Sequence, residues 1–199
     1  MIPLLSRPTC ARVGVFHLAA AVIFGCITLD AAQAATSPPV KDTYITLNLP
    51  GLVGDFTTVP NAPASSIQVL SLSTGAVAAC AQGGIACSVS VNNLSLIKAA
   101  DSASPKLFQA LVTSAPYATA VIYFWQAPPA GTTNYTKTFT IWLTHAILSS
   151  FSVGASEGGD SPQESVSLNF ATIAFQDNVT GSTACYNVVT KTTANALTC

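Results

Sequence analysis

Residues able to do acid–base or nucleophilic chemistry are scarce in this chain. His145 is the one histidine after the first 42 residues, so it is the only imidazole there that could serve a serine nucleophile as a general base. A lone histidine near the end of a strand is more often structural than catalytic. We therefore expect no Ser-His-acid triad.

Three acids lie close together late in the chain, at Glu157, Asp160 and Glu164. Such a group could form a carboxylate pair for glycoside hydrolysis or a weak calcium site. The spacing lacks the Asp-x-Asp-x-Asp-Gly pattern of a calcium loop, and the Gly-Gly and Ser-Pro pairs among the acids favour a turn. No glycine-rich phosphate loop precedes a helix, so nothing supports nucleotide binding. We expect no enzyme, no bound metal and no cofactor.

The cysteines are the remaining reactive groups. Four of the six lie after position 42, at Cys80, Cys87, Cys185 and Cys199. An even number of cysteines in an exported chain predicts disulfides, and four cysteines allow three pairings. Sequence proximity favours Cys80 with Cys87 and Cys185 with Cys199. A zinc site is the competing interpretation, but neither pair has the close spacing of zinc ligands.

The export prediction comes from the N-terminus. Arg7 and Arg12 precede an apolar run over 13–29, and Ala32-Gln33-Ala34 gives the small-x-small pattern of a cleavage site. Residues 1–34 are therefore predicted to be a secretory signal peptide; the alternative is a retained anchor. No later stretch is long and apolar enough to span a membrane. We expect the mature chain in the periplasm or outside the cell.

The composition excludes some partners. Only 8% of the residues are charged, 50% are hydrophobic, and the formal net charge is −1. Nucleic-acid binding would require clustered Lys and Arg, and disorder would require low hydrophobicity with high charge. A surface with so little charge repels copies of itself weakly, so self-association is favoured.

Hydrophobic periodicity predicts strands along most of the mature chain. Apolar and polar residues alternate, or apolar residues recur, in about eight segments: 44–49, 67–73, 89–96, 120–125, 135–143, 147–155, 165–175 and 186–189. One helix is expected, with Ser104 as N-cap, Pro105 in the first turn and an end near Pro116. The predicted fold is mainly β: a compact β-barrel or sandwich of about eight strands with one short α-helix packed on its side.

Four segments in order resemble the Hcp family, the inner-tube protein of type VI secretion systems. Residues 44–55 resemble its first strand and turn, 67–75 its second strand, 103–107 the start of its helix, and 157–170 its late loop and strand. The resemblance covers about 43–176. It leaves 35–42 as a mobile leader and 177–199 as a C-terminal extension.

The resemblance implies a structural protein without chemistry of its own. Subunits of this family form hexameric rings that stack into tubes, and small effector proteins are sheltered in the pore. The loop between its second and third strands reaches toward the next ring. Here that loop is 74–88, and the residues expected to shape it are Thr74, Gly75, Cys80, Gly83, Gly84 and Cys87. A Cys80–Cys87 disulfide would either prepare the loop for docking or merely stabilise it.

Three features set the chain apart from the family pattern: a signal peptide, disulfide-forming cysteines, and the tail 177–199, which extends beyond the match. The leading hypothesis is thus an exported relative that builds rings or tubes, with secretion-system components or small effectors as further partners. Trp125 and Trp142 are candidate subunit contacts, because tryptophan is enriched at interface hot spots. The alternative is an exported binding module, monomeric or a small oligomer, that keeps the fold without the ring.

Overall fold

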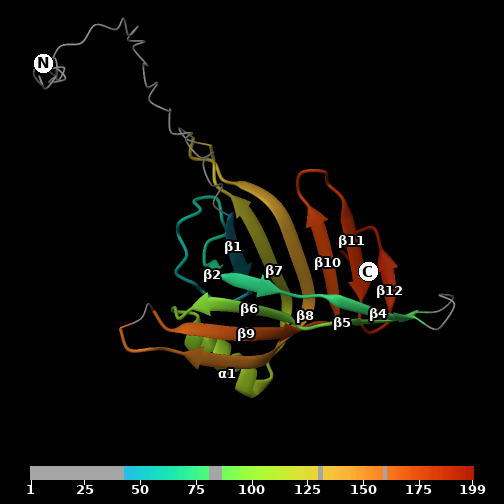
Figure 1. The fold of residues 1–199 in the computed structure, drawn as a ribbon, viewed down its shortest axis with the longest axis horizontal. Helices are drawn as coiled ribbons and strands as arrows, with labels where there is room; N and C mark the ends of the chain where they lie inside the picture. Colours follow the sequence, from blue (N-terminus) through green and yellow to red (C-terminus); the bar gives the residue numbers. More distant parts are fainter. Residues whose placement is uncertain (1–42, 81–86, 130–131, 159–160) are drawn as a thin grey trace, which may run out of the picture. The chain divides into compact units, whose positions relative to one another are not determined.

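A computed structural model describes residues 43–80, 87–129, 132–158 and 161–199 (Figure 1). The predicted signal peptide 1–34 and leader 35–42 lie outside the described residues, as do Gly83, Gly84 and Asp160.

The larger part of the fold is an antiparallel sheet, here called sheet A, with the strand order β12-β11-β10-β8-β7-β1-β2. Its strands are β1 (Thr43–Asn48), β2 (Ile67–Val69), β7 (Tyr117–Gln126), β8 (Thr136–Gly154), β10 (Thr172–Asp177), β11 (Thr183–Asn187) and β12 (Thr192–Ala194). Thr, Val, Ile and aromatic residues predominate in β7 and β8, as expected for a pleated, half-buried surface.

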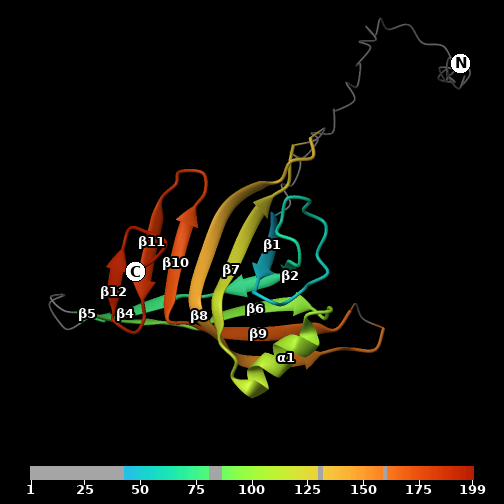
Figure 2. The ribbon, with the colours of Figure 1, turned by 180° about the vertical axis from the view of Figure 1, so that it is seen from behind.

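A second sheet, sheet B, packs across the first (Figures 1 and 2). It consists of β3 (Ser71–Ser73), β6 (Leu94–Ala99), β9 (Gln163–Asn169) and the second half of β8. The strand β8 belongs to both sheets: Thr144 pairs with β7 and β10, whereas Ile147 onward pairs with β9. His145 stands between these parts with φ +48°. A strand that bends and changes sheets makes the corner of an orthogonal β-sandwich.

The core lies between the two sheets. Leu47, Ile122 and Leu143 of sheet A meet Leu96 and Leu168 of sheet B, and each of these side chains is almost fully buried. Burial of one such aliphatic side chain contributes roughly 1.5–3 kcal/mol. The alternation of apolar and polar residues along the strands thus becomes an inner and an outer face of each sheet.

The single helix among the described residues is α1 (Ser104–Thr113), which lies beside β8 and β9 (Figure 2). Leu107 and Ala110 enter the core from it. The helix begins as predicted next to Pro105, but the N-cap is Ala103 and not Ser104, since the Ser104 hydroxyl bonds to Glu164 and Lys98 instead. It ends at Ser114, which has a left-handed backbone, φ +50°, shortly before Pro116.

Residues 74–88, predicted as a loop, contain most of a β-hairpin. β4 (Ala76–Cys80) pairs with β5 (Cys87–Val91) as a separate two-stranded sheet. The prediction failed because Ala, Ser and Gly give this segment little hydrophobic alternation to mark a strand.

The predicted extension 177–199 continues sheet A. β11 pairs with β10, and β12 pairs with β11, so these residues lengthen the same sheet. The one strand expected at 186–189 is instead two strands on either side of a turn. Asn187 forms that turn by accepting hydrogen bonds from the backbone N–H groups of Val189, at 3.0 Å, and Thr190, at 2.9 Å.

The mainly-β fold with one short helix is confirmed. The described residues form twelve strands. Four of the predicted segments, 67–73, 89–96, 165–175 and 186–189, each become two strands; β4 is additional, and 135–143 and 147–155 join into β8. The barrel is not closed: among the described residues, β12 and β2 each end sheet A with one edge unpaired. The sandwich is therefore the better description.

Candidate functional site

The β4–β5 hairpin is the most exposed element of the described chain. Every residue of β4, and every residue of β5 except Val91, is exposed. Val77 retains 59% of its accessible surface and Val89 38%. The disulfide Cys80–Cys87 closes the hairpin, and the two cysteines lie opposite each other in its register. This is one of the two pairs that sequence proximity favours.

A hollow of about 350 Å³ separates the base of the hairpin from sheet A. Its walls are largely apolar and come from the hairpin on one side and from β10 and β11 on the other. The lining residues are Thr74, Gly75, Ala76, Val89, Val91, Ile173, Phe175 and Tyr186. The hairpin thus projects from the sandwich with an apolar inner side.

The second disulfide, Cys185–Cys199, lies against sheet A. Cys185 is 3% exposed and pairs with Ala174 of β10 and Ala194 of β12. The Asn187 side-chain amide donates a hydrogen bond to the Cys199 carbonyl at 3.2 Å. This disulfide therefore fastens the C-terminus to the sheet.

The two tryptophans differ in position, which corrects one prediction. Trp125 is only 4% exposed, and its indole N–H donates to the Thr46 hydroxyl at 3.0 Å. It therefore stabilises its own subunit and cannot present its ring directly to a neighbour. Trp142 is partly exposed and remains a candidate contact.

Trp142 belongs to an aromatic cluster on the outer face of sheet A. The Tyr123 ring lies 6.4 Å from the Trp142 ring and 5.7 Å from the Trp125 ring, measured between centroids. The Lys137 ammonium lies 5.0 Å above Tyr123. Burial raises the pKa of the Tyr123 phenol above its ordinary value. Among the described residues, the Trp142 indole N–H has no hydrogen-bond partner.

The outer face of sheet B carries rows of serines that sequence reasoning missed. One row crosses all four strands through Ser73, Ser95, Ser167 and Ser150. A parallel row runs through Ser71, Ile97, Ser165 and Ser152. Both rows lack charged side chains. Serine at every second position, as in 71–73 and 165–167, was the available signal.

A buried ion cluster joins sheet B to the start of α1. The Lys98 ammonium lies 2.7 Å from a Glu164 carboxylate oxygen and 2.8 Å from an Asp101 oxygen. Lys98 is 0% and Glu164 2% exposed. Ser104 donates to the same Glu164 oxygen at 2.8 Å. Such a paired, hydrogen-bonded cluster fixes the elements that carry it.

This cluster corrects the interpretation of the late acids. Glu164 lies within β9 and is buried, so it is not part of the predicted turn, whereas Glu157 lies exposed in a turn. Within the described ranges, no three acid, histidine or cysteine side chains could together hold a metal ion. Glu164 therefore has a structural partner in Lys98.

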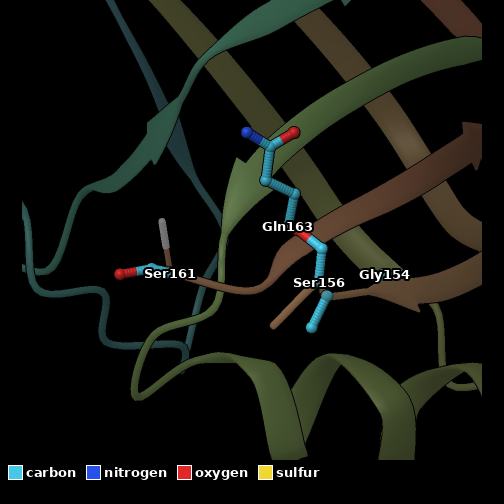
Figure 3. Close-up of a pocket in the computed structure, with 5 residues that line it drawn as sticks. Gly154, Ser156, Ser161 and Gln163 are labelled. Carbon is cyan, nitrogen blue, oxygen red and sulfur yellow. The ribbon is translucent and has the colours of Figure 1, made fainter. Parts of the chain in front are cut away.

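Sequence reasoning also overlooked a Gly-x-Ser-x-Gly pattern at Gly154–Gly158, which in hydrolases places a serine on a strand-to-helix turn. Here Ser156 follows β8 and precedes β9, so a strand and not a helix comes next (Figure 3). Gly154, Ala155, Ser156, Ser161 and Gln163 line the shallow hollow there. His145 is nine residues before Gly154 on β8, about 30 Å at roughly 3.3 Å per residue. Ser156 and His145 are therefore too far apart to act together as nucleophile and base.

His145 lines a different hollow, at the corner between the sheets. Its other lining residues are Ile147, Ser149, Asn169, Phe170, Ala171 and Val189. The set contains a serine but no Asp or Glu, so it lacks the acid of a triad. The exposed faces and the hairpin remain as the candidate functional surfaces.

The fold and these surfaces define a small mainly-β domain of two crossed sheets with one side helix. Residues 46–176, about two-thirds of the chain, match the family described as "Type VI secretion system effector, Hcp". The chain belongs to the Hcp family. It is accordingly an Hcp-like structural protein.

Solved structures show the same fold. Hcp1 from Salmonella typhimurium is 24% identical, with a TM-score of 0.64, over 76% of this chain and 99% of that one. A protein described as a type six secretion system protein is 22% identical, with a TM-score of 0.65, over 77% and 100%. Hcp2 from Salmonella typhimurium is 23% identical, with a TM-score of 0.55, over 77% and 98%. No curated protein is significantly similar to the chain.

Proposed function

We propose that this protein is an exported tube-type subunit that self-assembles into hexameric rings, which stack through the β4–β5 hairpin. Family membership across residues 46–176 carries the proposal. The hairpin supports it, because an exposed element with Val77 and Val89 on its surface is suited to docking on a neighbouring copy.

The Cys80–Cys87 disulfide supports the docking role in energetic terms. It joins the two strands at their last described pair, so fewer conformations are lost when the hairpin binds. Ordering one rotamer-rich side chain on binding costs about 0.5–1.5 kcal/mol, and a pre-ordered backbone avoids similar costs.

Ring closure needs two unlike surfaces on each subunit, because a head-to-tail contact closes only at a fixed rotation. Trp142 with Tyr123 and Lys137 supplies an aromatic surface on sheet A. The serine rows supply an uncharged hydroxyl surface on sheet B. We assign the aromatic surface to subunit contacts and the serine rows to the pore, where a neutral hydroxyl surface holds a passing protein only weakly.

Export rests on the predicted signal peptide and on the two disulfides, which suit an oxidising compartment. No helix in the described part of the chain is long and apolar enough to cross a bilayer. Assembly in the periplasm or outside the cell follows from this route, with small effector proteins or secretion-system components as the further partners.

The test is the mass in solution of the oxidised, exported protein, followed by electron microscopy of the same sample. Rings of about six subunits are expected. Val77→Glu should leave rings intact but prevent stacking, and Val112→Glu, which changes an equally exposed valine on α1, should affect neither. A monomer at high concentration would contradict the ring and leave the exported binding module.

A further inference from the structure

The two disulfides differ in their access to solvent. Cys80 and Cys87 are both exposed. Cys185 is 3% exposed and lies within the register of three paired strands, and Cys199 is partly buried. Thiol–disulfide exchange requires an external thiolate to reach a sulfur atom in line with the bond, so access governs its rate. The exposed bond is therefore the one that meets a reductant first.

Apart from that bond, little besides its own strand pairing holds the hairpin together in the described chain. Its strands pair only with each other within the described ranges. At its base, the Asn92 N–H donates to the Gly75 carbonyl at 2.8 Å. At its other end, Cys80 and Cys87 are the last pair among the described residues. A two-stranded hairpin by itself is marginally stable in water.

We propose that Cys80–Cys87 is a thiol-exchange site, a redox-controlled clasp that holds β4 to β5. A dithiol reductant supplies the electrons. Its thiolate attacks the sulfur of one cysteine, which forms a mixed disulfide and releases the other cysteine as a thiolate. The second thiol of the reductant then displaces the first cysteine. The reductant leaves as a disulfide, and the hairpin is left with two thiols.

Reduction changes the surface as well as the covalent bond. With the clasp closed, Ala76, Val89 and Val91 face Phe175 and Tyr186 across the hollow. With the clasp open, the strands separate from Cys80 and Cys87 toward the base at Gly75 and Asn92. The apolar side chains of the hairpin and of β10–β11 are then exposed together. Reduction of the disulfide therefore exposes an apolar surface.

This inference goes beyond ring formation and does not depend on it, because every step takes place within one subunit. Should the subunits form rings, reduction would also weaken their stacking. Should they remain monomers, the clasp would still open.

The test uses the full chain, expressed in an exporting bacterial host and purified oxidised. Dithiothreitol is added at limiting concentration, free thiols are alkylated at intervals, and the labelled cysteines are identified by mass spectrometry. Cys80 and Cys87 should be labelled at least about tenfold faster than Cys185 and Cys199. Equal rates for both pairs, or faster labelling of Cys185, would overturn the proposal.

Hydrogen exchange on the same samples tests whether breaking the disulfide opens the hairpin. Amides of 76–80 and 87–91 should exchange at least about tenfold faster after partial reduction, while those of β11 and β12 are unchanged. The double variant Cys80→Ser with Cys87→Ser should show the fast exchange without reductant. An apolar dye should bind this variant more strongly than the oxidised protein. Unchanged exchange in the variant would show that the bond does not hold the hairpin, and the clasp would be rejected.

Discussion

The chain contains two hairpins that are each secured by a disulfide, and they are built in opposite ways. The β4–β5 hairpin is exposed along nearly its whole length and pairs with nothing else in the described chain. The β11–β12 hairpin is hydrogen-bonded to β10, and its Cys185 is 3% exposed. Cys80–Cys87 therefore holds together a hairpin that lacks packing, whereas Cys185–Cys199 adds to a hairpin that the sheet already holds.

The two disulfides therefore act on different free energies: that of global unfolding and that of local opening of a hairpin. A cross-link stabilises a folded state to the extent that the unfolded chain would otherwise be freer than the folded one. Around Cys185 the folded chain is ordered by the sheet, so the cross-link acts on the whole unfolding transition. Around Cys80 the folded hairpin would itself be free without the bond, so the cross-link acts mainly on local opening.

The largest loss in the free energy of unfolding is expected from a substitution in the core. The same substitution tests whether the β4–β5 hairpin is independent of the core. Lys98→Met would leave the Glu164 carboxylate, 2% exposed, without its cation. Breaking a buried pair in this way costs about 3–5 kcal/mol in the free energy of unfolding. Urea unfolding followed by tryptophan fluorescence measures it, and hydrogen exchange in 76–80 should stay unchanged.

The matched control replaces both partners. Lys98→Met with Glu164→Met removes the unpaired charge, so most of the lost stability should return. If the double variant is as unstable as the single one, the loss comes from packing and not from charge. If exchange in 76–80 accelerates along with the core lesion, the hairpin is not independent and the comparison fails.

The next largest effect compares the disulfides directly. Cys185→Ser with Cys199→Ser opens a link between residues 14 apart in sequence, and global stability should fall by about 3 kcal/mol. Cys80→Ser with Cys87→Ser should lower it by less than about 1 kcal/mol, because the freed hairpin gains entropy in the folded state as well. Urea unfolding measures both, and a larger loss for the second variant would reverse the assignment.

Much of the sandwich could be predicted from alternation, because alternation reports which face of a strand is buried. The strands β1, β2 and β7 lie where the pattern placed them. The pattern could not show that 135–155 is one strand, because the bend at His145 interrupts alternation in the way that a loop would. It could not mark β4, whose exposed Ala residues have no buried face to report, and it found β5 only in part, as the start of the segment 89–96.

The ion cluster and the serine rows could also have been predicted from the alternation along the strands. Lys98 follows Leu94 and Leu96 at every second position, and Glu164 precedes Val166 and Leu168 in the same way. Both charges therefore stand at inward positions, and two opposite inward charges imply a pair. The contact partners of Trp125 were not predictable, because its burial depends on Thr46 from a distant strand.

A smaller loss in the free energy of unfolding is expected from the turn between β11 and β12. Asn187→Ala removes the acceptor for two backbone N–H groups and the donor to the Cys199 carbonyl. Net hydrogen bonds of this kind contribute about 0.5–1.5 kcal/mol each, and two of the three are exposed and so lie at the low end, so a loss of about 1.5–2 kcal/mol is expected in thermal or urea unfolding. Asn195→Ala, at an exposed position in the same region, is the control. Equal effects would mean that the turn bonds contribute nothing particular.

The smallest effect is a pH dependence located in the turn between β10 and β11. The Val179 N–H donates to the Asp177 carboxylate at 2.8 Å, and so does the Thr180 hydroxyl. These bonds hold the pKa of Asp177 below its ordinary value of 3.8. A lowered pKa in the folded state means stability that is present above the unfolded-state pKa and is lost as pH falls through the folded-state pKa. Urea midpoints between about pH 6 and pH 2 should therefore decline less for Asp177→Asn, whose amide cannot titrate. Thr180→Val removes one of the bonds and brings the folded-state pKa closer to its ordinary value, so its total decline should be smaller than that of the parent and larger than that of Asp177→Asn. Parallel curves for both variants and the parent would show that this carboxylate does not contribute to acid sensitivity, and the turn would then be held by its backbone bonds alone.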